Sequence, residues 1–133
     1  MYLLDTNVVS DVERRLPKPT AWLASVDPAS VNLSVITLGE IERGIVELRK
    51  VDSGKATRLD LWLRELRRDN ADRILAITEE VALVWGRITA GRTRGSADTL
   101  IAATALVHDL ILVTRNVADF EGTGVTVLNP WEI

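Results

Sequence analysis

The sequence contains no cysteine and only one histidine, His108, among its 133 residues. Without cysteine the chain cannot form disulfides, cysteine-ligated zinc sites or iron–sulfur clusters, and it has no thiol nucleophile. A single histidine also excludes any site that needs two imidazole ligands from one chain. Any metal or hydrolytic chemistry must therefore rest mainly on carboxylates, of which the sequence has 19.

The chain also lacks a strong charge of one sign and a long apolar run. Its 16 basic and 19 acidic residues give a net charge of −3, so the overall charge does not indicate a nucleic-acid-binding protein. No apolar run approaches the ~20 residues that span a bilayer, and the first residues lack the basic start of a signal peptide. We expect a cytoplasmic protein with no membrane partner, and a single domain over residues 1–133.

Short apolar runs alternate with segments of helical spacing. The runs predict strands at residues 2–4, 31–36, 73–77, 110–114 and 125–128. Apolar residues recur at helical spacing over residues 38–48, 59–66 and 81–88, and an apolar stretch covers 100–106. Strands that alternate with helices predict the α/β fold class, with a mostly parallel central sheet.

Several acidic residues are predicted to meet at one end of this sheet. Asp5 directly follows the first predicted strand, Asp119 follows the strand at 110–114, and Asp98 opens the helix that leads into that strand. Ligands of open parallel sheets bind at the carboxyl ends of the strands. Each acid also has a purely structural explanation, since Asp is favoured at helix caps, first helical turns and tight turns.

Glu40 is the fourth candidate, and it has the strongest competing explanation. The segment Thr37-Leu38-Gly39-Glu40 matches a capping box, which stabilises a helix start and needs no function. Four carboxylates converging at one sheet end would repel one another unless a cation lay among them. Oxygen-only ligands favour Mg²⁺ or Mn²⁺ over zinc.

Five segments together resemble a known family. They are Leu3–Asn7, Ser34–Ile41, Asp98–Ala105, Val113–Phe120 and Val127–Trp131. In this order and spacing they are similar to the PIN domain, and within it to the VapC-type (FitB-like) ribonuclease toxins of type II toxin–antitoxin systems. The resemblance covers residues 1–131, nearly the whole chain.

The resemblance implies a three-layer α/β/α sandwich and a Mg²⁺- or Mn²⁺-dependent endoribonuclease that hydrolyses RNA. It also implies a cognate antitoxin protein as partner and a homodimer. The family's catalytic roles carry over to Asp5, Glu40, Asp98 and Asp119, with Asp5, Asp98 and Asp119 as metal ligands. Some members have the fourth acid at the position of Asn116, and others at that of Asp119.

Polar and basic residues surround these acids in the sequence. Hydrogen-bonding residues that would support the carboxylates or a metal-bound water are Thr6, Ser96, Thr114 and Asn116. Basic residues that would form a rim for RNA phosphates are Arg92, Arg94 and Arg115. Helix capping, turn formation and ordinary ion pairing are the structural alternatives for these residues. His108 is expected to be an exposed residue at a helix end rather than a base.

The two apolar stripes at 38–48 and 59–66 offer more apolar surface than a one-sided helix pair needs. A groove between these helices would accept an amphipathic helix of the antitoxin. The structural alternative is that both stripes pack on the sheet and on each other.

Other families with acidic pockets fit less well. A receiver domain would have paired acids after the first strand and a lysine after the last, but Asp5 is followed by Thr6-Asn7 and no lysine follows Lys55. A haloacid-dehalogenase-like enzyme would have a second Asp at Asn7. The remaining alternative is a non-catalytic interaction module that keeps the PIN fold. The presence of all four candidate acids argues against that alternative.

Overall fold

Five short strands form one parallel sheet in the computed structural model, which describes residues 1–133. The strands are β1 (Tyr2–Leu4), β2 (Val31–Ser34), β3 (Ile74–Leu75), β4 (Ile111–Val113) and β5 (Val127–Leu128). Their order across the sheet is β3-β2-β1-β4-β5, and every neighbouring pair is parallel. Strand β1 is therefore central, with Leu3 in register with Asn32 on one side and Leu112 on the other.

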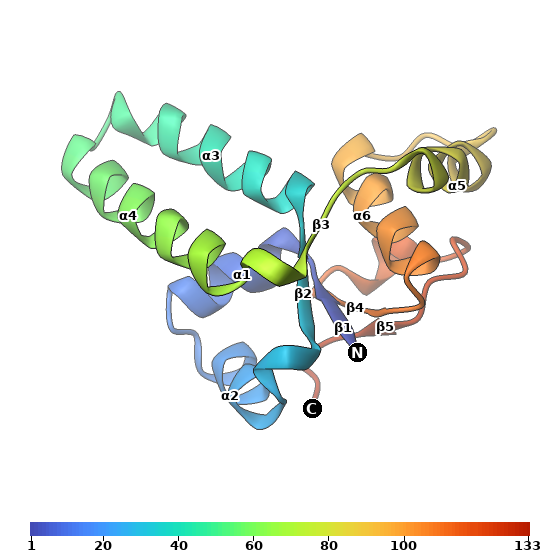
Figure 1. The fold of residues 1–133 in the computed structure, drawn as a ribbon, viewed down its shortest axis with the longest axis horizontal. Coiled ribbons are helices and arrows are strands. Elements are labelled where there is room, and N and C mark those ends of the chain that lie inside the picture. The colour runs from blue at the N-terminus through green and yellow to red at the C-terminus, as the bar shows by residue number, and fades with distance from the viewer.

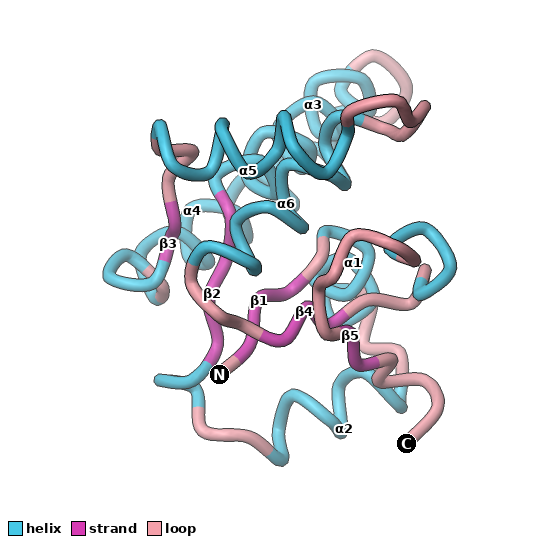
Figure 2. The backbone as a smooth tube through the Cα atoms, turned by 90° about the vertical axis from the view of Figure 1, so that its right-hand side faces the viewer, coloured by secondary structure: helices cyan, strands magenta, loops and turns pink.

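Six helices cover the sheet on both faces (Figures 1 and 2). They are α1 (Thr6–Glu13), α2 (Pro17–Ser25), α3 (Val35–Arg49), α4 (Ser53–Asp69), α5 (Glu79–Thr89) and α6 (Ser96–Val107). Leu3 and Leu112 pack with the buried face of α6, whereas Leu4 and Val113 pack with α1 and α2. Because neighbouring strand residues point to opposite faces, the sheet is buried on both sides. The three-layer α/β/α sandwich is confirmed.

Helices α3 and α4 form a long hairpin that extends away from the sheet on the left of Figure 1. Their predicted stripes meet each other around Ile45, Ala56 and Leu63. The stripes thus pack on each other, as the structural alternative expects. Only Ile45 and Leu63 of the two stripes are buried, however, and Val46 on α3 stays 53% exposed, so apolar surface remains on this hairpin. No helix in the structure has the length and apolar character needed to cross a membrane.

The sequence located every strand but placed some ends too far along the chain. Strand β2 ends at Ser34, because the Ser34 hydroxyl accepts a hydrogen bond from the backbone N–H of Ile36 and starts helix α3. The predicted strand at 73–77 is reduced to Ile74–Leu75. Helix α2 was not predicted, because it is short and begins at Pro17 without an apolar stripe. Thr78 caps α5, since its hydroxyl accepts a hydrogen bond from the backbone N–H of Val81.

Asp11 on α1 is the most deeply buried charged residue, with no exposed surface. Its carboxylate accepts hydrogen bonds from Arg14 at 2.7 Å, from the indole of Trp131 at 3.1 Å and from Arg115 at 3.3 Å. These partners come from the end of α1, the C-terminal segment and the loop after β4. One buried carboxylate thus joins three segments that are distant in sequence.

Replacing Asp11 by alanine should lower the free energy of unfolding by roughly 2–4 kcal/mol, because several charge-assisted hydrogen bonds are lost around a buried position. Arg14 and Arg115 are half exposed and can be hydrated, which keeps the loss below that of a fully buried ion pair. Chemical denaturation measures the change. Asp69→Ala is the control, since Asp69 and Arg68 form an exposed pair that is worth at most ~1 kcal/mol. Equal losses in the two variants would contradict the anchoring role of Asp11.

Candidate active site

Asp5 lies at the carboxyl end of the central strand and is only 3% exposed. Its Oδ1 accepts the backbone N–H of Thr6 at 2.7 Å, and its Oδ2 accepts the hydroxyl of Thr114 at 2.9 Å and the amide of Asn7 at 3.4 Å. Burial raises the pKa of Asp5 from 3.8 to about 6, even though the bonds from Thr114 and Thr6 lower it. The charges of Asp98 and Glu40 raise this pKa further.

Glu40 is held by a residue far from it in sequence. The hydroxyl of Thr6 donates to its Oε1 at 2.6 Å, and the hydroxyls of Thr6 and Thr37 are 3.0 Å apart. The capping-box explanation is wrong, because Ser34 caps α3 while Thr37 lies inside the helix and is fully buried. The sequence spacing matched the motif, but the helix begins three residues earlier than the motif requires.

Asp98 and Asp119 bring two further carboxylates to the same region. Asp98 lies in the first turn of α6, whose N-cap is Gly95 with no side-chain cap. Asp119 is exposed and lies in a short 3-10 helix, Val117–Phe120, that follows β4. Burial raises the pKa of Asp98, and the charges of Glu40 and Asp119 raise it further. Electrostatic repulsion thus links all four predicted acids, from Asp5 to Asp119.

The four acids fit a hard divalent cation in donor type, because they offer only oxygen and share a repulsion that a cation would relieve. The structure contains no group of three or more acidic, His or Cys side chains that could hold a metal ion as they stand. The predicted three-carboxylate coordination by Asp5, Asp98 and Asp119 is thus not formed here and stays a prediction. Mg²⁺ commonly binds through one or two carboxylates and keeps several waters, which the arrangement allows.

The predicted hydroxyl donors are used unequally. Thr6 and Thr114 each donate to a candidate acid, as described above. The backbone N–H of Asn116 donates to the Thr114 hydroxyl at 3.0 Å, while the Asn116 side chain is exposed. Ser96 is exposed at the first position of α6 and its hydroxyl makes no hydrogen bond to the chain.

Two of the three predicted rim arginines use their guanidinium groups within the chain. Arg94 donates to the backbone carbonyls of Asp119 and Glu121, and Arg115 contacts both oxygens of Asp11. The Arg92 guanidinium lies against Gly122, whose φ of +78° favours glycine. These contacts hold the loop that carries Asp119. An RNA-binding role for the three arginines stays a prediction.

Asn7, Asp11 and Thr37 contribute to the site region but were not assigned to it from the sequence. The Asn7 amide joins Asp5 and Thr114, and its Oδ1 accepts the backbone N–H of Arg115 at 3.4 Å. Asn7 and Asp11 are four residues apart on α1 and therefore share one helix face. The sequence does contain a signal that could have found these two residues, namely an amide and an acid four residues apart and next to the apolar Val8 and Val12. His108 is exposed at the end of α6, as expected.

Comparison with known proteins agrees with this geometry. The PIN domain family matches residues 2–123. Toxin FitB of Neisseria gonorrhoeae is 38% identical over 140 residues, which cover 98% of this chain and 99% of that protein. VapC ribonuclease Y4jK of Sinorhizobium fredii is 30% identical over 143 residues, which cover 99% of both.

The crystal structure of FitAcB from Neisseria gonorrhoeae superimposes on this fold with a TM-score of 0.90, at 37% identity and over the whole of both chains. The family match spans more than nine-tenths of the sequence and includes all four candidate acids. The parallel sheet and its two helical layers are thus those of a recognised family, and this chain belongs to the PIN-domain family.

Proposed function

We propose that the protein is the toxin of a toxin–antitoxin pair and acts as a Mg²⁺- or Mn²⁺-dependent endoribonuclease. The observation that carries the proposal is the buried Asp5, whose ionisation is opposed by burial and by two neighbouring acids. A protein gains nothing in stability from such an arrangement, and active sites commonly contain it. The relatives named toxin and ribonuclease support the same conclusion.

A divalent cation bound by these carboxylates would act as a Lewis acid on the scissile phosphate and lower the pKa of a bound water. Asp5, fixed by Thr6 and Thr114, would be the rigid ligand. Asp98 and Asp119, on two separate elements, would complete the site from the solvent side. Glu40 keeps Oε2 free of hydrogen bonds to the chain, so this atom is available to accept a proton from the attacking water.

The helix α6 provides a matched pair of variants for the nuclease activity. Asp98→Asn removes a candidate ligand at its start, whereas Asp109→Asn changes an exposed acid just beyond its end. Asp98→Asn should abolish cleavage of total RNA in Mg²⁺ or Mn²⁺ while the protein stays folded, because the neutral amide lacks the negative charge that a carboxylate offers to a divalent cation. Asp109→Asn should cleave as the wild type does, since Asn also tolerates the positive φ of 54° found there.

If the Asp98→Asn variant cleaved RNA as fast as the wild-type protein, Asp98 would not belong to the active site. The absence of cleavage by the wild-type protein itself would favour the non-catalytic interaction module.

The raised pKa of Asp5 predicts a specific dependence of stability on pH. Between pH 3.8, the unfolded value, and about 6, the folded protein keeps a proton that the unfolded chain releases. The free energy of unfolding contributed by Asp5 therefore falls as the pH rises through this window and stays low above it. In EDTA, the melting temperature of Asp5→Asn relative to wild type should rise from pH 4 to pH 6 and then level off.

Replacing the carboxylate by an amide also changes the cap of α1, but that effect on stability does not depend on pH. Comparing how the melting temperatures of the two proteins change with pH therefore removes it. Addition of Mg²⁺ at pH 7 should then stabilise the wild-type protein more than Asp5→Asn. A difference in melting temperature that is the same at every pH would contradict the burial of an ionisable Asp5.

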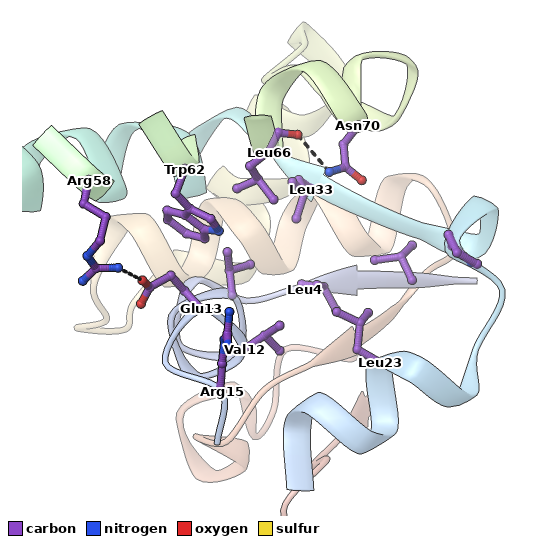
Figure 3. Close-up of a pocket in the computed structure, with 13 residues that line it drawn as sticks. Leu4, Val12, Glu13, Arg15, Leu23, Leu33, Arg58, Trp62, Leu66 and Asn70 are labelled. Atoms are coloured by element: carbon purple, nitrogen blue, oxygen red, sulfur yellow. Dashed lines mark hydrogen bonds and ion pairs between the residues drawn. The ribbon is translucent and has the colours of Figure 1, made fainter. Parts of the chain in front are cut away.

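An apolar hollow offers a docking surface for the antitoxin (Figure 3). It lies between α4, the α1–α2 pair and the sheet at β1 and β2. The groove that the sequence suggested between α3 and α4 is also present, but more of its lining residues are polar or charged, and α1 contributes to its lining. Its apolar lining residues include Leu4, Val12, Leu23, Leu33, Trp62 and Leu66. The ion pair between Glu13 and Arg58 borders it. An apolar hollow with a charged border is suited to an amphipathic helix. We also expect a homodimer, as the family resemblance implies.

A substitution that fills the hollow tests this partner without removing a core contact. Val12→Phe should occupy the hollow and weaken binding of the neighbouring gene's product at least tenfold, with little change in RNA cleavage by the free toxin. Val46→Phe is the control, because Val46 is exposed on α3 and does not line the hollow. Titration calorimetry measures both affinities. Unchanged binding by Val12→Phe would show that the antitoxin docks elsewhere.

A further inference from the structure

Three polar groups form a row from the interior of the fold to the candidate site. Thr37 is fully buried in α3, Thr6 is the first residue of α1, and Glu40 lies one helical turn beyond Thr37. The Thr6 hydroxyl is 3.0 Å from that of Thr37 and 2.6 Å from Oε1 of Glu40. The contact joins two helices whose residues are more than thirty positions apart in sequence.

The number of hydroxyl hydrogens fixes the direction in which hydrogen bonds are donated along this row. A hydroxyl has one hydrogen to donate, and an ionised carboxylate only accepts. The Thr6 hydrogen therefore goes to Glu40, and Thr6 Oγ1 must accept from Thr37. Thr37 has no other side-chain partner and no contact with solvent. The inner end of the row is closed to water, so the row cannot carry a proton through the protein, and its effect on Glu40 is one of orientation.

Thr6 also contacts the other buried acid of the site. Its backbone N–H donates to Asp5 Oδ1 at 2.7 Å, while its hydroxyl donates to Glu40 Oε1. One residue thus fixes an oxygen of each of two carboxylates that repel each other electrostatically. The backbone bond survives any substitution except proline, whereas the hydroxyl bond depends on Thr or Ser at this position.

On the basis of the proposed function, we propose that Thr6 and Thr37 are positioning residues that set the geometry of Glu40 relative to Asp5. Thr6 commits Oε1 of Glu40 to the protein. Oε2 makes no hydrogen bond to the chain, so it is the freer oxygen of Glu40, and its direction toward a cation or the attacking water is set by the bond to Oε1. Because Thr37 donates to Thr6 Oγ1, the hydroxyl hydrogen of Thr6 points toward Glu40, as this arrangement requires.

Four variants separate positioning from folding. Thr6→Val removes the hydroxyl at nearly constant shape, Thr6→Ser keeps it, and Thr37→Val removes only the inner donor. Thr104→Val is the matched control, since Thr104 is also fully buried but its hydroxyl bonds only to the carbonyl of Leu100 in its own helix. Mn²⁺ affinity, measured without RNA by electron paramagnetic resonance, is the first measurement. The cleavage constants kcat and KM are the second.

Thr6→Val should bind Mn²⁺ ~10- to 100-fold more weakly, because Glu40, which the proposal directs at the cation or at its bound water, is no longer held, and loss of such an orienting contact typically has an effect of this size. Its kcat should fall while KM for RNA stays constant, because Thr6 is not proposed to contact the substrate. Thr6→Ser should recover both values, and Thr37→Val should lie between Thr6→Val and wild type. Thr104→Val should match wild type in both.

Wild-type Mn²⁺ affinity and kcat in Thr6→Val would overturn the inference while the nuclease function stands. A Thr6→Ser variant as weak as Thr6→Val, or an equal loss in Thr104→Val, would also overturn it, by pointing to packing rather than to the hydroxyl. If Thr6→Val fails to fold, Thr37→Val decides, since it leaves Thr6 in place. Failure of the wild-type protein to bind Mn²⁺ and cleave RNA would overturn the proposed function itself.

Discussion

A carboxylate buried at the end of the central strand is the constraint on which the rest of this structure depends. Asp5 is nearly inaccessible to water, and the charges of Asp98 and Glu40 act against its ionised form. The fold supplies hydrogen bonds to both of its oxygens, from the first turn of α1 and from the residue after β4. These bonds only partly offset the burial, since the pKa remains raised. The sheet thus presents a group at its centre that a bound cation would stabilise.

Helix α1 organises the surroundings of this carboxylate through two different faces. One face carries Val8 and Val9, which close the apolar layer over the sheet together with Trp22 of the neighbouring α2. The other face carries Asn7 and Asp11, which hold the backbone and the side chain of Arg115, respectively. The loop after β4 is therefore fixed at two points on one helix. Further along, Arg94 holds the same loop through backbone carbonyls, so that the exposed Asp119 is carried by a well-supported segment.

The fold and the meeting of Asp5, Asp98 and Asp119 at one end of the sheet could be predicted from local patterns, whereas Glu40 entered through the family resemblance, and the catalytic roles of all four acids stay predictions. Apolar runs locate strands, and an acid directly after a strand falls at the functional end of a parallel sheet. The supporting contacts could not be predicted, because they join residues such as Thr6 and Glu40, or Asp11 and Trp131, that no local pattern relates. The capping box at Thr37 shows the opposite error, in which a local motif predicts a contact that is not formed. The motif is present in the sequence, but the helix has already begun at Val35. Site geometry is thus a property of the tertiary contacts.

The arginines near the acids illustrate how tertiary contacts change the meaning of a charge. A guanidinium attracts phosphate by its charge at a distance, but binds it in a bidentate way only when its N–H groups are free. Arg94 and Arg115 retain their charge, while Nη1 and Nη2 of Arg94 are engaged by carbonyls and Nη1 of Arg115 is engaged by Asp11. Their engaged N–H groups therefore hold the loop after β4, and only the remaining N–H groups are open to another ligand. Arg92 makes no hydrogen bond to the chain and its guanidinium lies against Gly122, so of the three it alone has every N–H group open to a ligand.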